Sequence, residues 1–162
     1  VVANFTGEKS ELCMAAVGAN TPLIGFIVNS VIAISLGANV IIATAVGMKN
    51  KALVSKTAVS SIIFSVLLGI SISIIGIILS PYILKSQNIP DEVLPLASSY
   101  FCIYMAGLPV IFLYNFESAV LRGVGDTKTP IAVLSISGVI NVLLNLFFVL
   151  IFLQLLFFFE SG

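Results

Sequence analysis

The sequence contains no histidine and no tryptophan, and it has only two cysteines. Without histidine, and with Cys13 and Cys102 far apart in the chain, it offers no ligand cluster that would bind zinc or haem. The two cysteines are expected to behave as small apolar residues. Since a catalytic triad is also missing, we predict that the chain is not an enzyme.

Charged residues are scarce as well, at 9% of the chain, and the formal net charge is zero. Soluble domains are about a quarter charged, because water must solvate their surface. Here apolar residues reach 59%, so the surface must face lipid. A zero net charge also leaves no basic surface of the kind that binds nucleic acid. The sequence therefore predicts an integral membrane protein, with the lipid bilayer as its first partner.

The remaining charged residues separate four long apolar runs. We place the membrane spans at about residues 21–46, 57–84, 94–121 and 130–156. Each exceeds the roughly 20 residues that a helix needs to cross the hydrocarbon. The runs lack the alternation of barrel strands, and open strands would leave backbone groups unpaired in lipid. The predicted fold class is all-α, a polytopic transmembrane helix bundle.

Basic residues in the short loops indicate the orientation of these helices. The loop at 47–56 has three lysines and the loop at 122–129 has two basic residues, whereas 85–93 has one. Because cytoplasmic loops are enriched in Lys and Arg, we expect loops 47–56 and 122–129 to be cytoplasmic, in a multi-pass protein of the plasma membrane. Both chain ends then lie on the other side. No signal peptide is visible, so an upstream span is needed and the chain is expected to begin within a longer protein.

Two of the predicted helices carry small residues at steps of four. The first row is Gly25, Asn29, Ala33 and Gly37; the second is Ser61, Ser65, Gly69 and Ser73, followed by Gly76 and Ser80. Small residues allow helices to approach closely in lipid, so both rows predict tight packing. A polar pore wall is the alternative.

The third predicted helix carries a more polar row, which consists of Tyr100, Tyr104, Gly107, Ile111, Asn115 and Ser118. Pro109 lies in the middle of this helix and should kink it, either as a hinge beside a cavity or as a static bend. Glu117 is the only charged residue inside a predicted span. It is either an interfacial carboxylate, snorkelling or paired with Arg122, or a carrier of protons.

Asn141 and Asn145 lie one turn apart in the fourth span. An unpaired amide in hydrocarbon costs several kcal/mol, so both should face protein or a watery cavity. They could join helices or form a binding site. Our candidates for the wall of a substrate cavity are Asn29, Tyr104, Asn115, Asn141 and Asn145.

The loop before this span has explicit turn chemistry. Its motif residues are Arg122, Gly123, Gly125, Asp126, Thr127 and Pro130. The two glycines tolerate positive φ, Thr129 could cap the next helix, and Pro130 suits a first helical turn. A dinucleotide fingerprint would need a third glycine where Lys128 stands, so nucleotide binding is rejected here.

Three stretches, in this order, resemble the multidrug and toxic compound extrusion (MATE) family. Residues 16–51, which include Ser35-Leu36-Gly37-Ala38-Asn39, are similar to that family's second helix, and residues 56–58 to the start of the next. Residues 121–130 resemble the loop between its fourth and fifth helices. Asn141 and Asn145 fall where the fifth helix has an Asn followed, four residues later, by Asp or Asn. The resemblance extends to about residue 152.

The resemblance implies a secondary transporter of about twelve helices in two lobes, which exports organic cations and other drugs in exchange for Na⁺ or H⁺. Residues 1–156 would form part of the N-terminal lobe, its helices two to five, and residues 157–162 an atypical tail. The partners implied are a drug-like substrate and the missing helices of the same transporter. No cofactor is implied beyond the coupling ion, for which Asn141 and Asn145 are candidate ligands. Asn145 replaces the Asp of acidic members, and an amide can ligate Na⁺ but cannot carry a proton.

Two other functions are compatible with this composition. A flippase of the same superfamily would move lipid-linked precursors, but it needs a cationic cavity and no span has an internal Lys or Arg. The chain could also be a truncated membrane fragment without transport activity.

Overall fold

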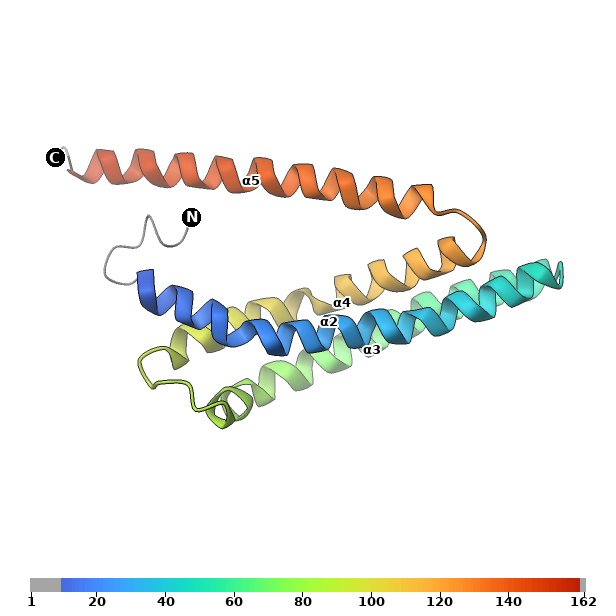
Figure 1. Cartoon of the computed structure of the whole chain (residues 1–162), viewed down its shortest axis with the longest axis horizontal. Coiled ribbons are helices and arrows are strands. Elements are labelled where there is room, and N and C mark those ends of the chain that lie inside the picture. The colour runs from blue at the N-terminus through green and yellow to red at the C-terminus, as the bar shows by residue number, and fades with distance from the viewer. Residues whose placement is uncertain (1–9, 161–162) are drawn as a thin grey trace. The chain divides into compact units, whose positions relative to one another are not determined.

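The computed structural model contains four helices: α2 (Ser10–Gly47), α3 (Lys51–Ser86), α4 (Leu94–Gly123) and α5 (Lys128–Glu160) (Figure 1). It describes the backbone of residues 10–160 and, except for Ser10, Val149 and residues 152–160, their side chains. All four helices are long and apolar enough to span a membrane, and residues 10–160 contain no strand. The predicted all-α polytopic bundle is confirmed.

The predicted spans match the helices, with one large difference. Helix α2 begins at Ser10, whereas its span was placed from residue 21. Pro22 lies inside α2 and does not start it. The residues of the predicted tail up to Glu160 continue α5, while 161–162 and the segment before Ser10 lie outside the described residues.

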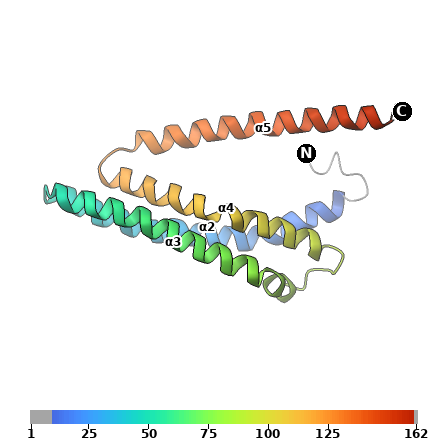
Figure 2. The same cartoon turned by 180° about the vertical axis from the view of Figure 1, so that it is seen from behind.

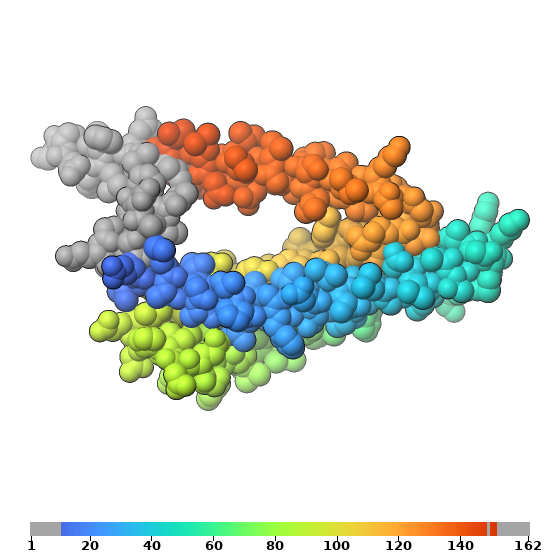
Figure 3. Space-filling view, in the orientation of Figure 1, coloured from blue at the N-terminus to red at the C-terminus, as the bar shows by residue number. Residues whose placement is uncertain are grey.

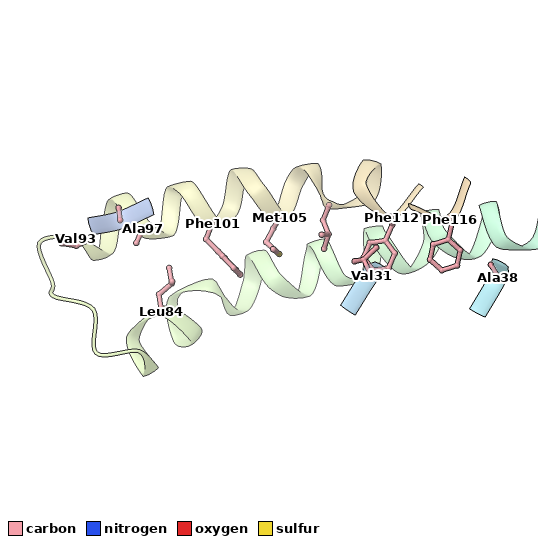
Figure 4. Close-up of a cluster of buried hydrophobic side chains, with 11 residues drawn as sticks. Val31, Ala38, Leu84, Val93, Ala97, Phe101, Met105, Phe112 and Phe116 are labelled. Atoms are coloured by element: carbon pink, nitrogen blue, oxygen red, sulfur yellow. The ribbon is translucent and has the colours of Figure 1, made fainter. Parts of the chain in front are cut away.

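The chain divides at Asp126 into a three-helix unit, α2–α4, and the single helix α5. In the three-helix unit α4 packs along both α2 and α3, which contact each other much less (Figure 2). Large α4 side chains form the centre of the core: Phe101, Met105, Leu108, Phe112 and Phe116. They recur at steps of three and four, so they share one side of α4 (Figure 4).

The row of small residues on α3 is the surface that receives these side chains. A Cβ added at Gly69 would lie 2.8 Å from the Pro109 Cα and 3.1 Å from the Phe112 Cβ. Ser65 is fully buried, and its hydroxyl donates to the Ile62 carbonyl at 2.7 Å, so it needs no partner on another helix. The tight packing predicted for this row is confirmed.

The corresponding prediction for α2 is wrong within the three-helix unit. A Cβ added at Gly25 or Gly37 would meet no atom within 4 Å. The buried face of α2 is a different one, made of Ala16, Asn20, Val31, Ser35, Ala38, Ile42 and Ala45. Small size permits a close approach but does not determine which side of a helix is approached.

Two side-chain amides tie α2 to α4. The Asn20 Nδ2 donates to the carbonyl of Ala97 at 3.0 Å, and the Asn39 Nδ2 donates to that of Ala119 at 3.1 Å. Beside the second bond, a Cβ added at Gly123 would lie 2.7 Å from the Ile42 Cγ2. The C-terminal ends of α2 and α4 therefore meet, which places the α2–α3 turn and the end of α4 at one end of the unit.

The turn between α2 and α3 is much shorter than the loop expected at 47–56. Only Met48, Lys49 and Asn50 separate the helices. Lys49 adopts a φ of 54°, and the Asn50 Oδ1 accepts from the Leu53 amide at 3.0 Å. Asn50 is therefore the cap of α3, and the lysines at 51 and 56 lie on the first turns of the helix.

The turn before α5 confirms part of the predicted turn chemistry. Gly125 has a φ of 94°, and α5 starts at Lys128, so Pro130 does fall in the first turn. The cap, however, is Asp126 and not Thr129. The Asp126 Oδ1 accepts from the amides of Lys128 and Thr129 at 3.1 and 3.0 Å, and the Thr129 hydroxyl donates to Oδ2 at 2.6 Å. These bonds, the Thr129 hydroxyl foremost, hold the pKa of the Asp126 carboxyl below its usual value.

Alanine substitutions at three glycines should separate close packing from helix propensity. Gly69→Ala forces the Pro109 backbone to move, so we expect the free energy of unfolding to fall by about 1–3 kcal/mol. Gly76→Ala should cost less, because its Cβ would meet the flexible Met105 side chain. Gly107→Ala meets nothing within 4 Å and should instead stabilise by about 0.5–1 kcal/mol. The free energies of unfolding of the three variants can be measured in mixed detergents by circular dichroism. Equal changes for Gly69→Ala and Gly107→Ala would contradict the packing described.

The cap of α5 should titrate, since a carboxylate accepts these bonds and a protonated acid accepts them poorly. A lowered pKa means that the cap stabilises the helix above the usual carboxyl pKa, and that this contribution is lost as pH falls through the lower folded value. In an NMR titration of the Asp126 carboxyl carbon, Thr129→Val should shift the midpoint upwards. Thr127→Val is the matched control, because Thr127 makes no bond to Asp126, and a Thr129→Val midpoint that equals wild type would refute the assignment.

Candidate functional site

The amides of Asn141 and Asn145 form a pair on α5. The Asn145 Nδ2 donates to the Asn141 Oδ1 at 2.9 Å, and both residues are exposed. This bond satisfies one donor and one acceptor, which lowers the cost of placing amides in a span. It leaves the Asn145 carbonyl oxygen and the Asn141 amide hydrogens available to a ligand.

The surroundings of this pair on α5 are mostly apolar, with Ser137 four residues before Asn141. Gly138 lies one turn before Asn141 and leaves open space beside it, since a Cβ there would meet no atom within 4 Å. Leu134 and Phe148 continue the same side of the helix, at 61% and 64% exposure. The pair is therefore a polar patch on a largely apolar helix, and it can offer a carbonyl oxygen to a cation or amide hydrogens to a polar substrate.

The other cavity candidates belong to the three-helix unit. Asn29 is exposed on α2 and Asn115 half-buried on α4, and each amide donates to its own helix, at the Gly25 and Ile111 carbonyls, over 2.8 Å. Tyr104 is half-buried against the core of α4. The five candidates thus form two groups, one on α5 and one in the three-helix unit, and a hydrogen bond joins the two on α5, Asn141 and Asn145.

Glu117 and Arg122 do not form the predicted ion pair. Both are exposed, and within the described residues neither has an ionic partner. Side chains meet on a helix at spacings of three or four, and these two are five positions apart. Glu117 is left as an exposed carboxylate between the buried residues Phe116 and Ser118.

Asn20 and Asn39, the amides that join α2 to α4, were not singled out from the sequence. Asn20 is fully buried, and its Oδ1 is without a hydrogen-bond partner among the described residues. No spacing rule distinguishes these two from Asn29, which bonds only to its own helix. The difference depends on which side of α2 faces α4.

The motif residues of the α4–α5 turn act locally. Gly123 permits the contact with α2, Gly125 supplies the positive φ, and Asp126 caps α5, while Arg122 and Thr127 are exposed. In the described part of the chain, no three His, Cys, Asp or Glu residues come together as metal ligands. In the described residues, Gly123, Gly125 and Asp126 of this turn therefore serve to shape the turn and the helix ends beside it.

The chain is similar to a known protein family and to several bacterial proteins. The family described as MatE matches residues 1–147. The probable multidrug resistance protein YoeA of Bacillus subtilis (strain 168) is 34% identical over 131 residues, which are 81% of this chain and 28% of YoeA. The probable multidrug resistance protein NorM of Thermotoga maritima is 28% identical over 141 residues, 87% of this chain and 30% of NorM. The probable multidrug resistance protein YpnP of Bacillus subtilis (strain 168) is 36% identical over 85 residues, 52% of this chain and 19% of YpnP.

No solved structure gives a significant match to the chain. The chain spans less than a third of the length of each of these three relatives. A match over residues 1–147 of 162 nevertheless covers three of the four helices completely and most of the fourth. Because the match covers most of the chain and includes the turn motif and the paired amides, the chain belongs to the MatE family.

Proposed function

We propose that the complete protein is a secondary active exporter, which moves organic cations or other xenobiotics out of the cell in exchange for Na⁺ or H⁺. In this proposal the chain supplies helices two to five of the N-terminal lobe. The names of the relatives, probable multidrug resistance proteins, support the cargo class. The observation that carries the proposal is the exposed Asn141–Asn145 pair, two hydrogen-bonded amides on a mostly apolar helix.

The pair suits a coupling ion that is bound through oxygen. With its Nδ2 engaged by Asn141, Asn145 presents its carbonyl oxygen, which is a ligand for a hard cation such as Na⁺. Neither amide can take up or release a proton. We therefore assign Na⁺ binding to this side of α5, and any H⁺ coupling would need a carboxylate elsewhere in the complete protein.

The proposed orientation places the exporter in the plasma membrane with the α2–α3 and α4–α5 turns in the cytoplasm. It is supported by the three lysines at 49, 51 and 56. The contact between the Asn39 amide and the Ala119 carbonyl is compatible with it, because the α2–α3 turn and the end of α4 then lie at the same membrane face.

A flippase of lipid-linked precursors is not favoured. Such a cargo carries phosphate and needs cationic side chains inside the spans. The lysines and the arginine of the described residues lie at helix ends and turns instead. If the complete gene gives no transport in the assay below, the alternative of a membrane fragment without transport activity is favoured instead.

Removing the amide pair should abolish export. We expect cells that express the complete gene to accumulate less ethidium than control cells, and the double variant Asn141→Leu, Asn145→Leu to lose at least about tenfold of this activity, the effect of roughly 1.4 kcal/mol of lost binding. Val142→Leu with Leu146→Ile is the matched control, at the same spacing on apolar positions of α5. Membrane expression is measured by immunoblot, and unchanged efflux in the amide variant would exclude a role for the pair.

A carboxylate in place of one amide should change the pH dependence of export. Asn145→Asp keeps an oxygen ligand but adds a group that titrates, so its efflux should become dependent on external pH while wild-type efflux depends on Na⁺. Vesicles with imposed Na⁺ or pH gradients separate the two. Wild-type efflux that a pH gradient alone can drive would contradict the assignment of Na⁺ to this site.

A further inference from the structure

A groove separates α2 from α3 near the turn that joins them. Its volume is about 600 Å³, within the roughly 300–1,000 Å³ of ligand-sized pockets. Gly37 and Ile41 line it from α2, Phe64 and Lys56 from α3, and Phe116 from α4. It lies wholly within the three-helix unit, where α2 and α3 contact each other less than either contacts α4. Figure 3 shows α2 on the face of this unit towards the viewer.

The groove exists because α2 leaves its row of small residues uncovered in this unit. Gly37 has no side chain and no neighbour within 4 Å of where a Cβ would stand. The apolar residues that flank it are open to the surroundings, with Ile34, Ile41 and Phe64 at 46%, 53% and 50% exposure. A hydrocarbon chain could therefore lie against this wall without displacing any side chain of the core.

Polar groups gather at the end of the groove nearest the turn. Lys56, Thr57 and Ser60 line it on α3, and Phe64 follows two helical turns deeper, about 12 Å along the axis at 1.5 Å per residue. After Leu53, the α3 wall thus offers an ammonium group and hydroxyls towards the turn, whereas the deeper part of the groove is apolar apart from Ser61. This is the polarity of a phospholipid, which has a phosphate at one end and acyl chains at the other.

Near this end, the charged residues of α2, α3 and the turn between them are all lysines, while Glu117 of α4 follows the groove-lining Phe116. Lys49 and Lys51 line a second hollow of about 480 Å³ at the α2–α3 turn, close in sequence to Lys56. The chain contains no Asp or Glu from residue 12 to residue 90. None of the three lysines has an ionic partner among the described residues. Basic pockets between transmembrane helices attract anionic lipid head groups.

We propose that the α2–α3 groove binds an anionic phospholipid, with an acyl chain along Gly37, Ile41 and Phe64 and the phosphate at Lys56. The hydroxyl of Thr57 or Ser60 donates to a phosphate oxygen, and Lys49 and Lys51 add to the positive potential. A zwitterionic lipid of the same chain length fills the groove equally well but gains less from the lysines. The proposal rests on the geometry of the three-helix unit and not on the transport activity proposed above.

The test compares lipids of one chain length on the complete purified protein. Native mass spectrometry in mild detergent follows the binding of phosphatidylglycerol and of phosphatidylcholine. Wild type should prefer phosphatidylglycerol, and Lys56→Gln should reduce that preference about fivefold, the effect expected for one lysine at an anionic lipid surface. Lys85→Gln is the matched control, because Lys85 lies at the other end of α3 and does not line the groove.

A second variant tests the acyl chain separately from the charge. Gly37→Leu fills the apolar part of the groove and should weaken the binding of both lipids, whereas Gly25→Leu, an open position on the same helix outside the groove, should weaken neither. If Lys56→Gln does not give a monodisperse protein, Thr57→Val replaces it, with a smaller loss of the same preference expected.

Four results would overturn the proposal. The first three are equal binding of the two lipids by wild type, equal binding by the Lys56 and Lys85 variants, and competition by glycerol phosphate as effective as by phosphatidylglycerol, which would indicate an anion site without an acyl chain. The fourth is unchanged lipid binding by Gly37→Leu, which would show that the groove is not the binding site. Ethidium efflux measured on the same variants keeps the two proposals apart, since lipid binding can persist where transport fails.

Discussion

The close approach of α4 to α3 determines the arrangement of the three-helix unit. Inside a membrane, burying apolar surface gains little, because lipid is as apolar as the helix interface. Helix association therefore depends on close van der Waals packing, which small residues permit. Gly69 allows the backbone at Pro109 to come near, and Phe112 fills the space beside it. Among the buried serines of α3, Ser65 donates to a carbonyl of its own helix, and the Ser80 hydroxyl lies 3.4 Å from the Ser98 hydroxyl and from the Cys102 thiol, so both hydroxyls are paired within the unit.

Helix α2 is attached in a different way. Asn20 and Asn39 each donate to a carbonyl of α4, and Gly123 admits Ile42 at one of these points. Interhelical amide bonds of this kind contribute about 1 kcal/mol each in a membrane. Because α2 is attached to α4 more than to α3, the small residues around Gly37 face a groove and not a helix. The proposed lipid site is a consequence of that attachment.

The proposed function depends on the amide pair of helix α5. Asn141 and Asn145 bond to each other, so the pair can enter a membrane at a moderate cost and still present a carbonyl oxygen and amide hydrogens. The Asp126 carboxylate caps the start of the same helix. An amide does not titrate, so under the proposed function export would depend on the coupling ion and not on the protonation of this pair.

The sequence alone determined the membrane class, the four helices to within a few residues at most ends, the positive φ of Gly125 and the family, because each depends on composition, local turn chemistry or the order of motifs. The early start of α2 was missed, because the predicted span begins at residue 21 whereas the helix begins at Ser10 and continues through Pro22. The tertiary structure alone decided which sides of the helices are buried. The rows at Gly37 and Gly69 look equivalent in sequence, yet only the second is packed within the three-helix unit, and Asn20 joins two helices where Asn29 does not. The physical reason is that lipid-facing and protein-facing sides of a membrane helix are equally apolar, so periodicity, which identifies the buried side in water, carries no such signal here.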